Sequence, residues 1–125
     1  MHFQTAPGQA KLVRAARGSV LDVVVDLRRG SPTFGEWEGF ELSDENMRQL
    51  FVPVGFAHGF LVTSEVADFT YRCSNYYDPI TESGIAFDDP DVGIEWPADF
   101  ELIVSERDRE APRLSEIAES LPFRI

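Results

Sequence analysis

The chain has 125 residues, of which 43% are hydrophobic and 12% are aromatic, so it is long enough to bury the core of one globular domain. Its net charge of -11 would repel a phosphate backbone and argues against nucleic acid as a partner, although a few local cations still allow a nucleotide-sized anion to bind in a pocket. Cys73 is the single cysteine, which excludes an internal disulfide and a zinc site built from cysteines.

The hydropathy pattern contains no run of 18 apolar residues, and the first residues lack the basic and apolar regions of a signal peptide. We therefore expect a cytoplasmic protein with no membrane partner. No internal repeat, low-complexity segment or linker interrupts the chain, so residues 1–125 are expected to form a single domain.

Alternating apolar residues predict strands over 9–17, 19–27, 37–42 and 48–52, with a turn at 29–33 and a loop or helical turn at 43–47. The second of these strands has one continuous apolar face, which we expect the fold to bury: Leu21, Val23, Val25 and Leu27. Its other face should line a cavity or meet solvent: Val20, Asp22, Val24 and Asp26.

Residues 52–62 contain a turn marked by Pro53 and Gly55, followed by a strand that places His58 between two phenylalanines on one face. Gly59, beside His58, allows another backbone or a ligand to approach closely. The structural interpretation of His58 is a hydrogen-bonded histidine in an aromatic core. The functional interpretation is a histidine that projects into a barrel, because Pro-x-Gly-x-x-His resembles half of the second cupin motif.

The second half of the chain continues the strand pattern over 65–73, which places Tyr71 on the same face as Phe69. Residues 75–84 are expected to form a loop, 85–96 contain turn signals with a short strand possible on either side, and 102–104 are expected to form an edge strand. Helical spacing after Pro112 predicts a short amphipathic helix. Many short strands with one terminal helix predict an all-β barrel or jelly roll.

The chain offers little for metal binding or nucleophilic catalysis. It has two histidines, His2 and His58, and Gln4 stands where a His-x-His pair would place its second histidine. A metal-dependent cupin would have to use carboxylates or a second subunit, and we predict no metal. Neither a Gly-x-Ser-x-Gly elbow nor a Gly-x-x-x-x-Gly-Lys phosphate loop is present.

The residues that remain form an acid/base set: His2, His58, Tyr71 and Lys11, the one lysine in a chain with ten arginines. Such a set suits proton abstraction next to a carbonyl, because an imidazole can take the proton, a cation can stabilise the enolate oxygen and a phenol can return a proton. Spacing along the chain does not show whether these groups converge.

Many collinear segments resemble the dTDP-4-dehydrorhamnose 3,5-epimerase family, and together they cover nearly the whole chain. They are His2-Phe3-Gln4, Gln9-Ala10-Lys11-Leu12-Val13-Arg14, Gly18, Asp22-Val23-Val24-Val25-Asp26, Ser31-Pro32-Thr33-Phe34-Gly35, Leu42-Ser43, Arg48-Gln49-Leu50, Gly55-Phe56-Ala57-His58-Gly59-Phe60, Phe69-Thr70-Tyr71, Asn75-Tyr76-Tyr77 and Asp89-Pro90-Asp91-Val92-Gly93-Ile94-Glu95-Trp96-Pro97.

The resemblance implies a cupin-type jelly roll that works as a homodimer without metal or other cofactor. It also implies inversion of C3 and C5 of dTDP-4-dehydro-6-deoxyglucose on the way to dTDP-L-rhamnose. In this chain His2 matches the catalytic base, Asp108 its paired carboxylate, Tyr71 the acid on the opposite face and Lys11 the cation beside the enolate. The resemblance further implies substrate contacts by His58, Tyr76 and Tyr77. We add the hypothesis that Asp22 orients Lys11 or His58.

Each of these residues also has a structural interpretation. Asp108 lies three residues after Ser105, the spacing of a helix N-terminal cap. Tyr71 could be a core tyrosine at the mouth of the barrel, and Lys11 could extend along apolar surface to reach solvent. For Asp22, Tyr76 and Tyr77 the sequence leaves the structural and functional interpretations equally open.

Family members carry a substantial segment before the motif that His2 begins, including first strands, an arginine shortly before the base and residues that grip the nucleotide. We therefore expect the chain as given to bind dTDP-sugar weakly and to epimerise it slowly or not at all. Robust turnover would contradict this. A 3-epimerase or 5-epimerase of another deoxysugar pathway, and a binding or structural module without catalysis, are the alternative functions.

Overall fold

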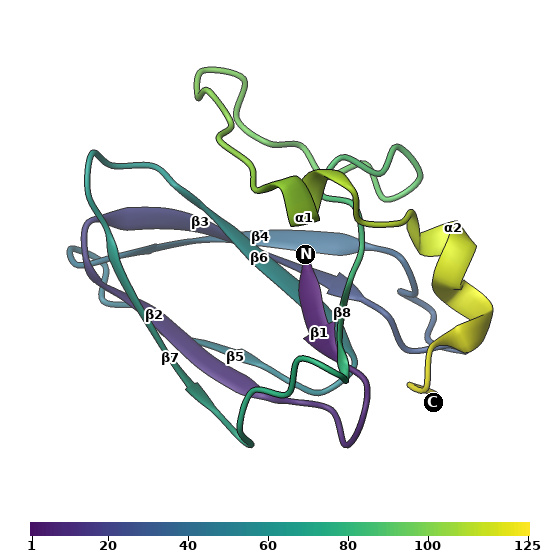
Figure 1. Cartoon of the computed structure of the whole chain (residues 1–125). Coiled ribbons are helices and arrows are strands. Elements are labelled where there is room, and N and C mark those ends of the chain that lie inside the picture. The colour runs from purple at the N-terminus through teal and green to yellow at the C-terminus, as the bar shows by residue number, and fades with distance from the viewer.

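Two antiparallel β-sheets face each other, and short helices lie at one side of them (Figure 1). The computed structural model describes all 125 residues. The larger sheet has five strands in the order β4 (Trp37–Ser43), β3 (Ser19–Asp26), β6 (Phe56–Val62), β1 (His2–Gln4) and β8 (Glu82–Gly84). The smaller sheet has three strands in the order β5 (Leu50–Val52), β2 (Lys11–Arg17) and β7 (Asp68–Cys73). The predicted all-β jelly-roll class is confirmed.

The helices are all short: α1 (Glu106–Arg109), α2 (Leu114–Ile117) and a 3₁₀ turn, η1 (Ala118–Ser120). The predicted C-terminal helix corresponds to α2 and η1, and it begins after Pro112 as expected. Figure 1 shows α1 beside the first strand, with α2 further along the same side of the larger sheet. None of the helices has the length and apolar character needed to cross a membrane.

Three local predictions were wrong. Residues 102–104 form no strand, because a run of three apolar residues is equally typical of a loop that lines a cavity, and here they line one. No strand flanks the turns between 88 and 93. The segment 75–84, expected to be a loop throughout, ends in β8, because Gln4, Phe3 and His2 of β1 offer it a pairing partner at Glu82, Ser83 and Gly84.

Strand β3 is buried on both faces, which the sequence predicted only in part. Val23, Val25 and Leu27 are buried as expected, but they pack beneath the C-terminal segment, with Leu114, Leu121 and Phe123 in one hydrophobic core. On the other face, Val20 is fully buried between the two sheets in a second core with Val13, Ala15 and Leu42. The structure thus has one core inside the sandwich and another outside it.

Strand β1 is held against β6 by the close approach predicted at Gly59. A Cβ atom built at Gly59 would lie 2.7 Å from the sulfur of Met1, so a larger residue would displace that side chain. The register pairs His2 with His58, and both histidines therefore project from the same face of the larger sheet. That face looks into the space between the sheets.

Candidate active site

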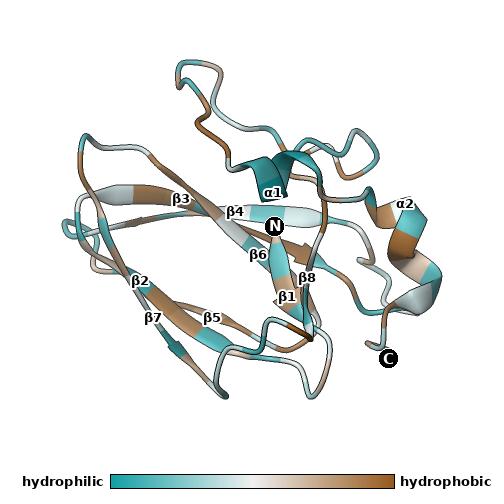
Figure 2. Ribbon diagram, in the orientation of Figure 1, coloured by the Kyte–Doolittle hydropathy of each residue, from teal (hydrophilic) through white to brown (hydrophobic).

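A pocket of about 470 Å³ opens where β1, β8 and α1 approach the smaller sheet. It is lined by residues from both sheets and by the apolar segment 102–104. Figure 2 shows this segment in brown, just before the hydrophilic helix α1. Six of the eight residues that the sequence singled out line this pocket: His2, Lys11, His58, Tyr71, Tyr77 and Asp108. The fold therefore brings together side chains that are up to 106 positions apart.

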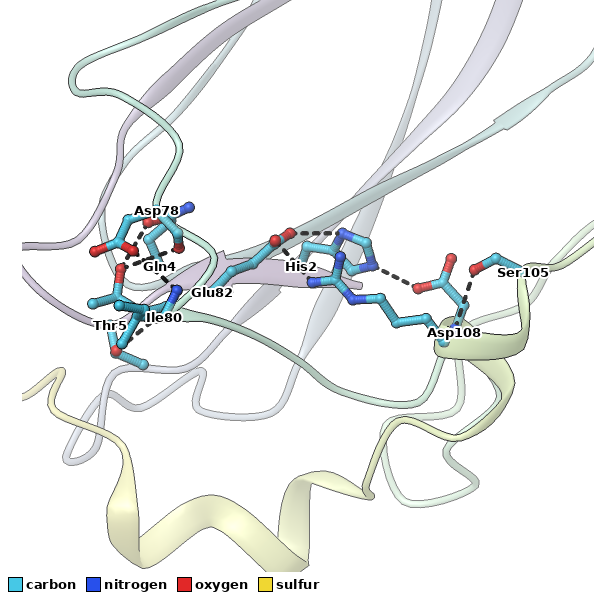
Figure 3. Close-up of polar contacts among 10 residues, drawn as sticks. His2, Gln4, Thr5, Asp78, Ile80, Glu82, Ser105 and Asp108 are labelled. Carbon is cyan, nitrogen blue, oxygen red and sulfur yellow. Dashed lines mark hydrogen bonds and ion pairs between the residues drawn. The ribbon is translucent and has the colours of Figure 1, made fainter.

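His2 and Asp108 form the shortest polar contact in this pocket. Nε2 of His2 lies 2.5 Å from Oδ1 of Asp108, which joins β1 to α1 (Figure 3). Burial alone would raise the pKa of Asp108, but the hydrogen bond and the charge of His2 hold that pKa below its usual value. The Asp108 backbone N–H also donates to the Ser105 hydroxyl at 3.2 Å, so Asp108 takes part in the predicted helix cap and contacts His2 as well.

Tyr71 and Lys11 reach the pocket from the smaller sheet, opposite His2. Tyr71 pairs with Val13 and Lys11 with Cys73, so both side chains lie on the inward face of the β2–β7 pair. The Tyr71 side chain is 58% exposed and lines the pocket, and is not a buried core tyrosine. Burial lowers the pKa of the Lys11 ammonium from its ordinary value, against opposing effects of Cys73, Glu82 and Asp22.

His58 is both a core residue and a pocket residue. It is 7% exposed, its ring stacks on Phe69 with centroids 6.2 Å apart, and it still lines the pocket. Its Nε2 lies 2.8 Å from Oδ2 of Asp22, a carboxylate with no exposed surface. Asp22 thus contacts His58 and forms no hydrogen bond with Lys11. Asp22 does not line the pocket itself, and its contact with His58 is the one that the hypothesis of an orienting role requires.

The expected aromatic pair is split. Tyr77 lines the pocket, whereas Tyr76 is 96% exposed and lies outside it. The two tyrosines are adjacent in an irregular stretch before β8, where neighbouring side chains point in different directions. Only Tyr77 therefore has the position expected of a substrate-binding aromatic residue. The pKa of its phenol is raised, mainly by a hydrogen bond to Glu82.

Glu82 and Arg107 belong to the site, and the sequence did not single them out. Oε1 of Glu82 lies 3.3 Å from Nδ1 of His2 (Figure 3). Nη2 of Arg107 lies 2.8 Å from Oε2 of Glu82. Glu82 falls in a stretch that the sequence predicted as a loop, where a single acidic residue carries no signal. Arg107 is recognisable only by its position next to Asp108.

The arrangement suits proton transfer at two faces of a bound ring. His2 with its carboxylate stands on one side of the pocket, and a phenol and an ammonium stand on the other. Such groups can remove a proton, stabilise the negative charge that develops and return a proton. No group of three or more histidine, cysteine, aspartate or glutamate side chains is placed to hold a metal ion.

This chain is similar in sequence and in fold to known proteins of one family. A family model described as dTDP-4-dehydrorhamnose 3,5-epimerase matches residues 1–116. The dTDP-4-dehydrorhamnose 3,5-epimerase of Methanothermobacter thermautotrophicus is 52% identical over 118 residues, which are 93% of this chain and 64% of that protein. A Streptomyces niveus protein named dTDP-4-dehydrorhamnose 3-epimerase is 47% identical over 117 residues, covering 93% of this chain and 56% of that protein.

Solved structures agree. The crystal structure of dTDP-6-deoxy-D-glucose-3,5-epimerase from Legionella pneumophila, in complex with dTDP-4-keto-L-rhamnose, superposes with a TM-score of 0.93 at 49% identity and covers 98% of this chain and 65% of that chain. This chain thus covers between 56% and 65% of the length of these relatives, which is less than two thirds of each. The match over residues 1–116 and the 52% identity together show that the chain belongs to the dTDP-4-dehydrorhamnose 3,5-epimerase family.

Proposed function

We propose that this chain carries the site that epimerises dTDP-4-dehydro-6-deoxy-D-glucose at C3 and C5 to dTDP-4-dehydro-L-rhamnose, in dTDP-L-rhamnose biosynthesis. The observation that carries the proposal is the position of His2, paired with Asp108 at 2.5 Å, across one pocket from Tyr71 and Lys11. Members of the family and the ligand named for the Legionella structure support the choice of substrate.

The proposed reaction moves protons only. His2 takes the proton from C3 or C5, and the electron pair of the broken C–H bond moves toward the C4 carbonyl oxygen to give an enolate. The ammonium of Lys11 stabilises that oxygen. Tyr71 then delivers a proton to the same carbon from the opposite face, which inverts its configuration, and solvent restores the protonation states of His2 and Tyr71. No redox cofactor is needed for this balance.

Wash-in of solvent deuterium tests the proposal. In D₂O the sugar should gain deuterium at C3 and C5, and His2→Ala and Tyr71→Phe should each reduce the rate by about 10² to 10⁴. Tyr76→Phe is the matched control, because Tyr76 loses the same hydroxyl but lies outside the pocket. A Tyr71→Phe rate equal to the Tyr76→Phe rate would exclude the phenol of Tyr71 as the acid.

A single-carbon epimerase is the second candidate. The Streptomyces niveus relative, whose name specifies a 3-epimerase, is 47% identical to this chain, so the chain is similar to proteins named for both kinds of reaction. Deuterium confined to C3 or to C5 would select this function.

A binding or structural module would bind dTDP-sugar without any exchange. Calorimetric titration with dTDP alongside the deuterium assay distinguishes it from both epimerases. The homodimer implied by the resemblance and the cytoplasmic location remain predictions. Sedimentation equilibrium tests the first of them.

A further inference from the structure

His2 has a carboxylate at each of its two ring nitrogens. Nε2 contacts Asp108 at 2.5 Å and Nδ1 contacts Glu82 at 3.3 Å (Figure 3). The Glu82 side chain is 10% exposed, compared with 30% for Asp108 and 34% for His2, so Glu82 is the most buried member of the three. Glu82 comes from β8 and Asp108 from α1, which places His2 between two elements that approach from different sides.

The number of N–H groups on the imidazole determines how many of the two carboxylates His2 can donate to. A neutral imidazole has one N–H in either tautomer, so it can donate to only one of the two carboxylates. The other carboxylate would then face a nitrogen lone pair, which is unfavourable. Only the imidazolium has two N–H groups and can donate to both carboxylates at once. The placement of the two carboxylates is thus complementary to the imidazolium, the form that a histidine base has after it has taken a proton.

A neutral base must release one carboxylate, and the geometry indicates Glu82. Its contact with His2 is the longer one, and it has a second cation, Arg107, at 2.8 Å. Burial would raise the pKa of Glu82, but hydrogen bonds from Tyr77 and Arg107 keep that pKa below its ordinary value. Glu82 therefore stays ionised and paired when it loses His2, which avoids a buried unpaired charge.

We propose that Glu82 is a positioning residue that engages His2 only in its imidazolium form and that Arg107 competes with His2 for this carboxylate. In the proposed reaction the proton that leaves C3 or C5 of the sugar moves to Nδ1 of His2, whereas Nε2 faces Asp108. Glu82 then accepts a hydrogen bond from the new N–H and takes no proton itself. The role in catalysis rests on the proposed function of His2 as base, whereas the contacts that carry the inference do not.

Other charged or titratable groups also face His2, and the variants that shift the His2 titration leave all of these residues unsubstituted. They are the amino group of Met1, Lys11 of β2, His58 of β6, Tyr71 of β7, Tyr77 and Asp108. Among them, Tyr77 also forms hydrogen bonds with Glu82 and Arg107, so both substitutions change its surroundings. Glu82 and Arg107 carry opposite charges, so their substitutions should act on His2 in opposite directions, which a shared change at Tyr77 would not produce.

Proton NMR titration of the histidine C2–H signals gives the pH at which His2 gains its second ring proton. This midpoint reports directly on the contact between Glu82 and the imidazolium of His2. The chain has two histidines, and His2→Gln identifies the signal of His2. Glu82→Gln removes the carboxylate charge that favours the imidazolium, so the titration midpoint of His2 should fall by about half a pH unit or more. Arg107→Gln removes the competing cation, so the midpoint should rise by a similar amount.

Opposite shifts of the His2 titration midpoint in the two variants distinguish the proposed contact from a merely structural role of Glu82 and Arg107. A structural role would shift the midpoint in the same direction in both variants. The double variant Glu82→Gln/Arg107→Gln should match Glu82→Gln, because Arg107 acts mainly through Glu82. Glu119→Gln is the matched control: Glu119 forms an exposed ion pair with Arg29 at 3.3 Å, far from the pocket lining, and should leave the midpoint unchanged. The His58 signal is an internal reference, since His58 contacts Asp22.

An unchanged His2 midpoint in Glu82→Gln, or a fall in Arg107→Gln, would overturn the proposal. Arg107 is 56% exposed, so its variant keeps the test valid even if Glu82→Gln fails to fold. The titration needs no turnover. If the shifts occur but deuterium exchange does not, the positioning contact stands and the epimerase function fails. Where exchange is measurable, the acidic limb of its pH profile should move in the same two directions.

Discussion

His2 and Asp108 lie 106 positions apart in the chain and 2.5 Å apart in the structure. Composition and periodicity contain no signal for such a contact, and only the resemblance to a known family paired the two residues. Glu82, at the other nitrogen of His2, was not found at all, because no spacing in the sequence relates an acidic residue in a predicted loop to a histidine in the first strand. At the scale of residues, the sequence identified the chemical groups and the fold determined which of them meet.

Asp108→Asn tests the value of the carboxylate charge beside His2. Asparagine keeps a hydrogen-bond acceptor for the imidazole but loses the charge that stabilises the imidazolium, so the exchange rate at C3 and C5 should fall by at least about tenfold to a hundredfold. Glu106→Gln on the same helix is the control, since Glu106 does not line the pocket. Equal exchange rates for the two variants would show that the Asp108 charge plays no part.

Most strands were predicted because their own residues alternate. Strands β2, β3, β4, β6 and β7 each contain six or more residues, long enough for the alternation to be visible. Strands β1 and β8 have three residues each, and they are strands because they pair with each other and β1 also pairs with β6. Helix α1 has four residues and was visible only through the spacing of Ser105 and Asp108.

The turn between β2 and β3 depends on Gly18, and Gly18→Ala should destabilise the protein strongly. Gly18 has a φ of 75°, and a Cβ atom there would lie 2.1 Å from the carbonyl oxygen of Val66. Gly30→Ala is the matched control, because Gly30 has a φ of 86° but its nearest contact would be 3.5 Å away. Thermal unfolding should show a cost of about 1–2 kcal/mol for Gly30→Ala from backbone strain alone and a distinctly larger one for Gly18→Ala. Equal costs would mean that the Val66 contact relaxes freely.

Asp26, at the end of β3, makes the turn that follows it dependent on pH. Its side chain is 3% exposed and accepts hydrogen bonds from Arg28, Ser31 and Thr33. Although burial works in the opposite direction, these bonds, led by the one from Arg28, hold the pKa of Asp26 far below its usual value. A carboxyl with a depressed pKa in the folded state stabilises the fold above its unfolded pKa, about 3.9, and this stabilisation is lost as the pH falls further.

Asp26→Asn should therefore lower the free energy of unfolding by about 2 kcal/mol or more near pH 7, because an amide cannot accept all of these bonds. The difference from the unsubstituted chain should narrow as the pH falls below about 4. Urea unfolding across this pH range measures it. A difference that stays constant down to pH 2 would show that the charge of Asp26 contributes nothing to stability.

The whole molecule has one core between its sheets and another outside the larger sheet. The sequence predicted that Val23, Val25 and Leu27 would be buried but did not indicate what covers them, because the covering residues Leu114, Leu121 and Phe123 lie about 90 positions further along the chain. The C-terminal segment that covers this outer face follows directly after α1, which carries Asp108 to His2. The core outside the larger sheet and the position of the paired carboxylate therefore depend on the same part of the chain.

The central claim is that His2 removes a proton from the sugar ring, and deuterium wash-in measures this step most directly. Because the label accumulates with time, even a slow site gives a measurable rate at high protein concentration. We predict that the 125-residue chain introduces deuterium at C3 and C5 of dTDP-4-dehydro-6-deoxyglucose and that His2→Ala lowers this rate by about 10² to 10⁴. Label that enters equally fast with His2→Ala would contradict the claim.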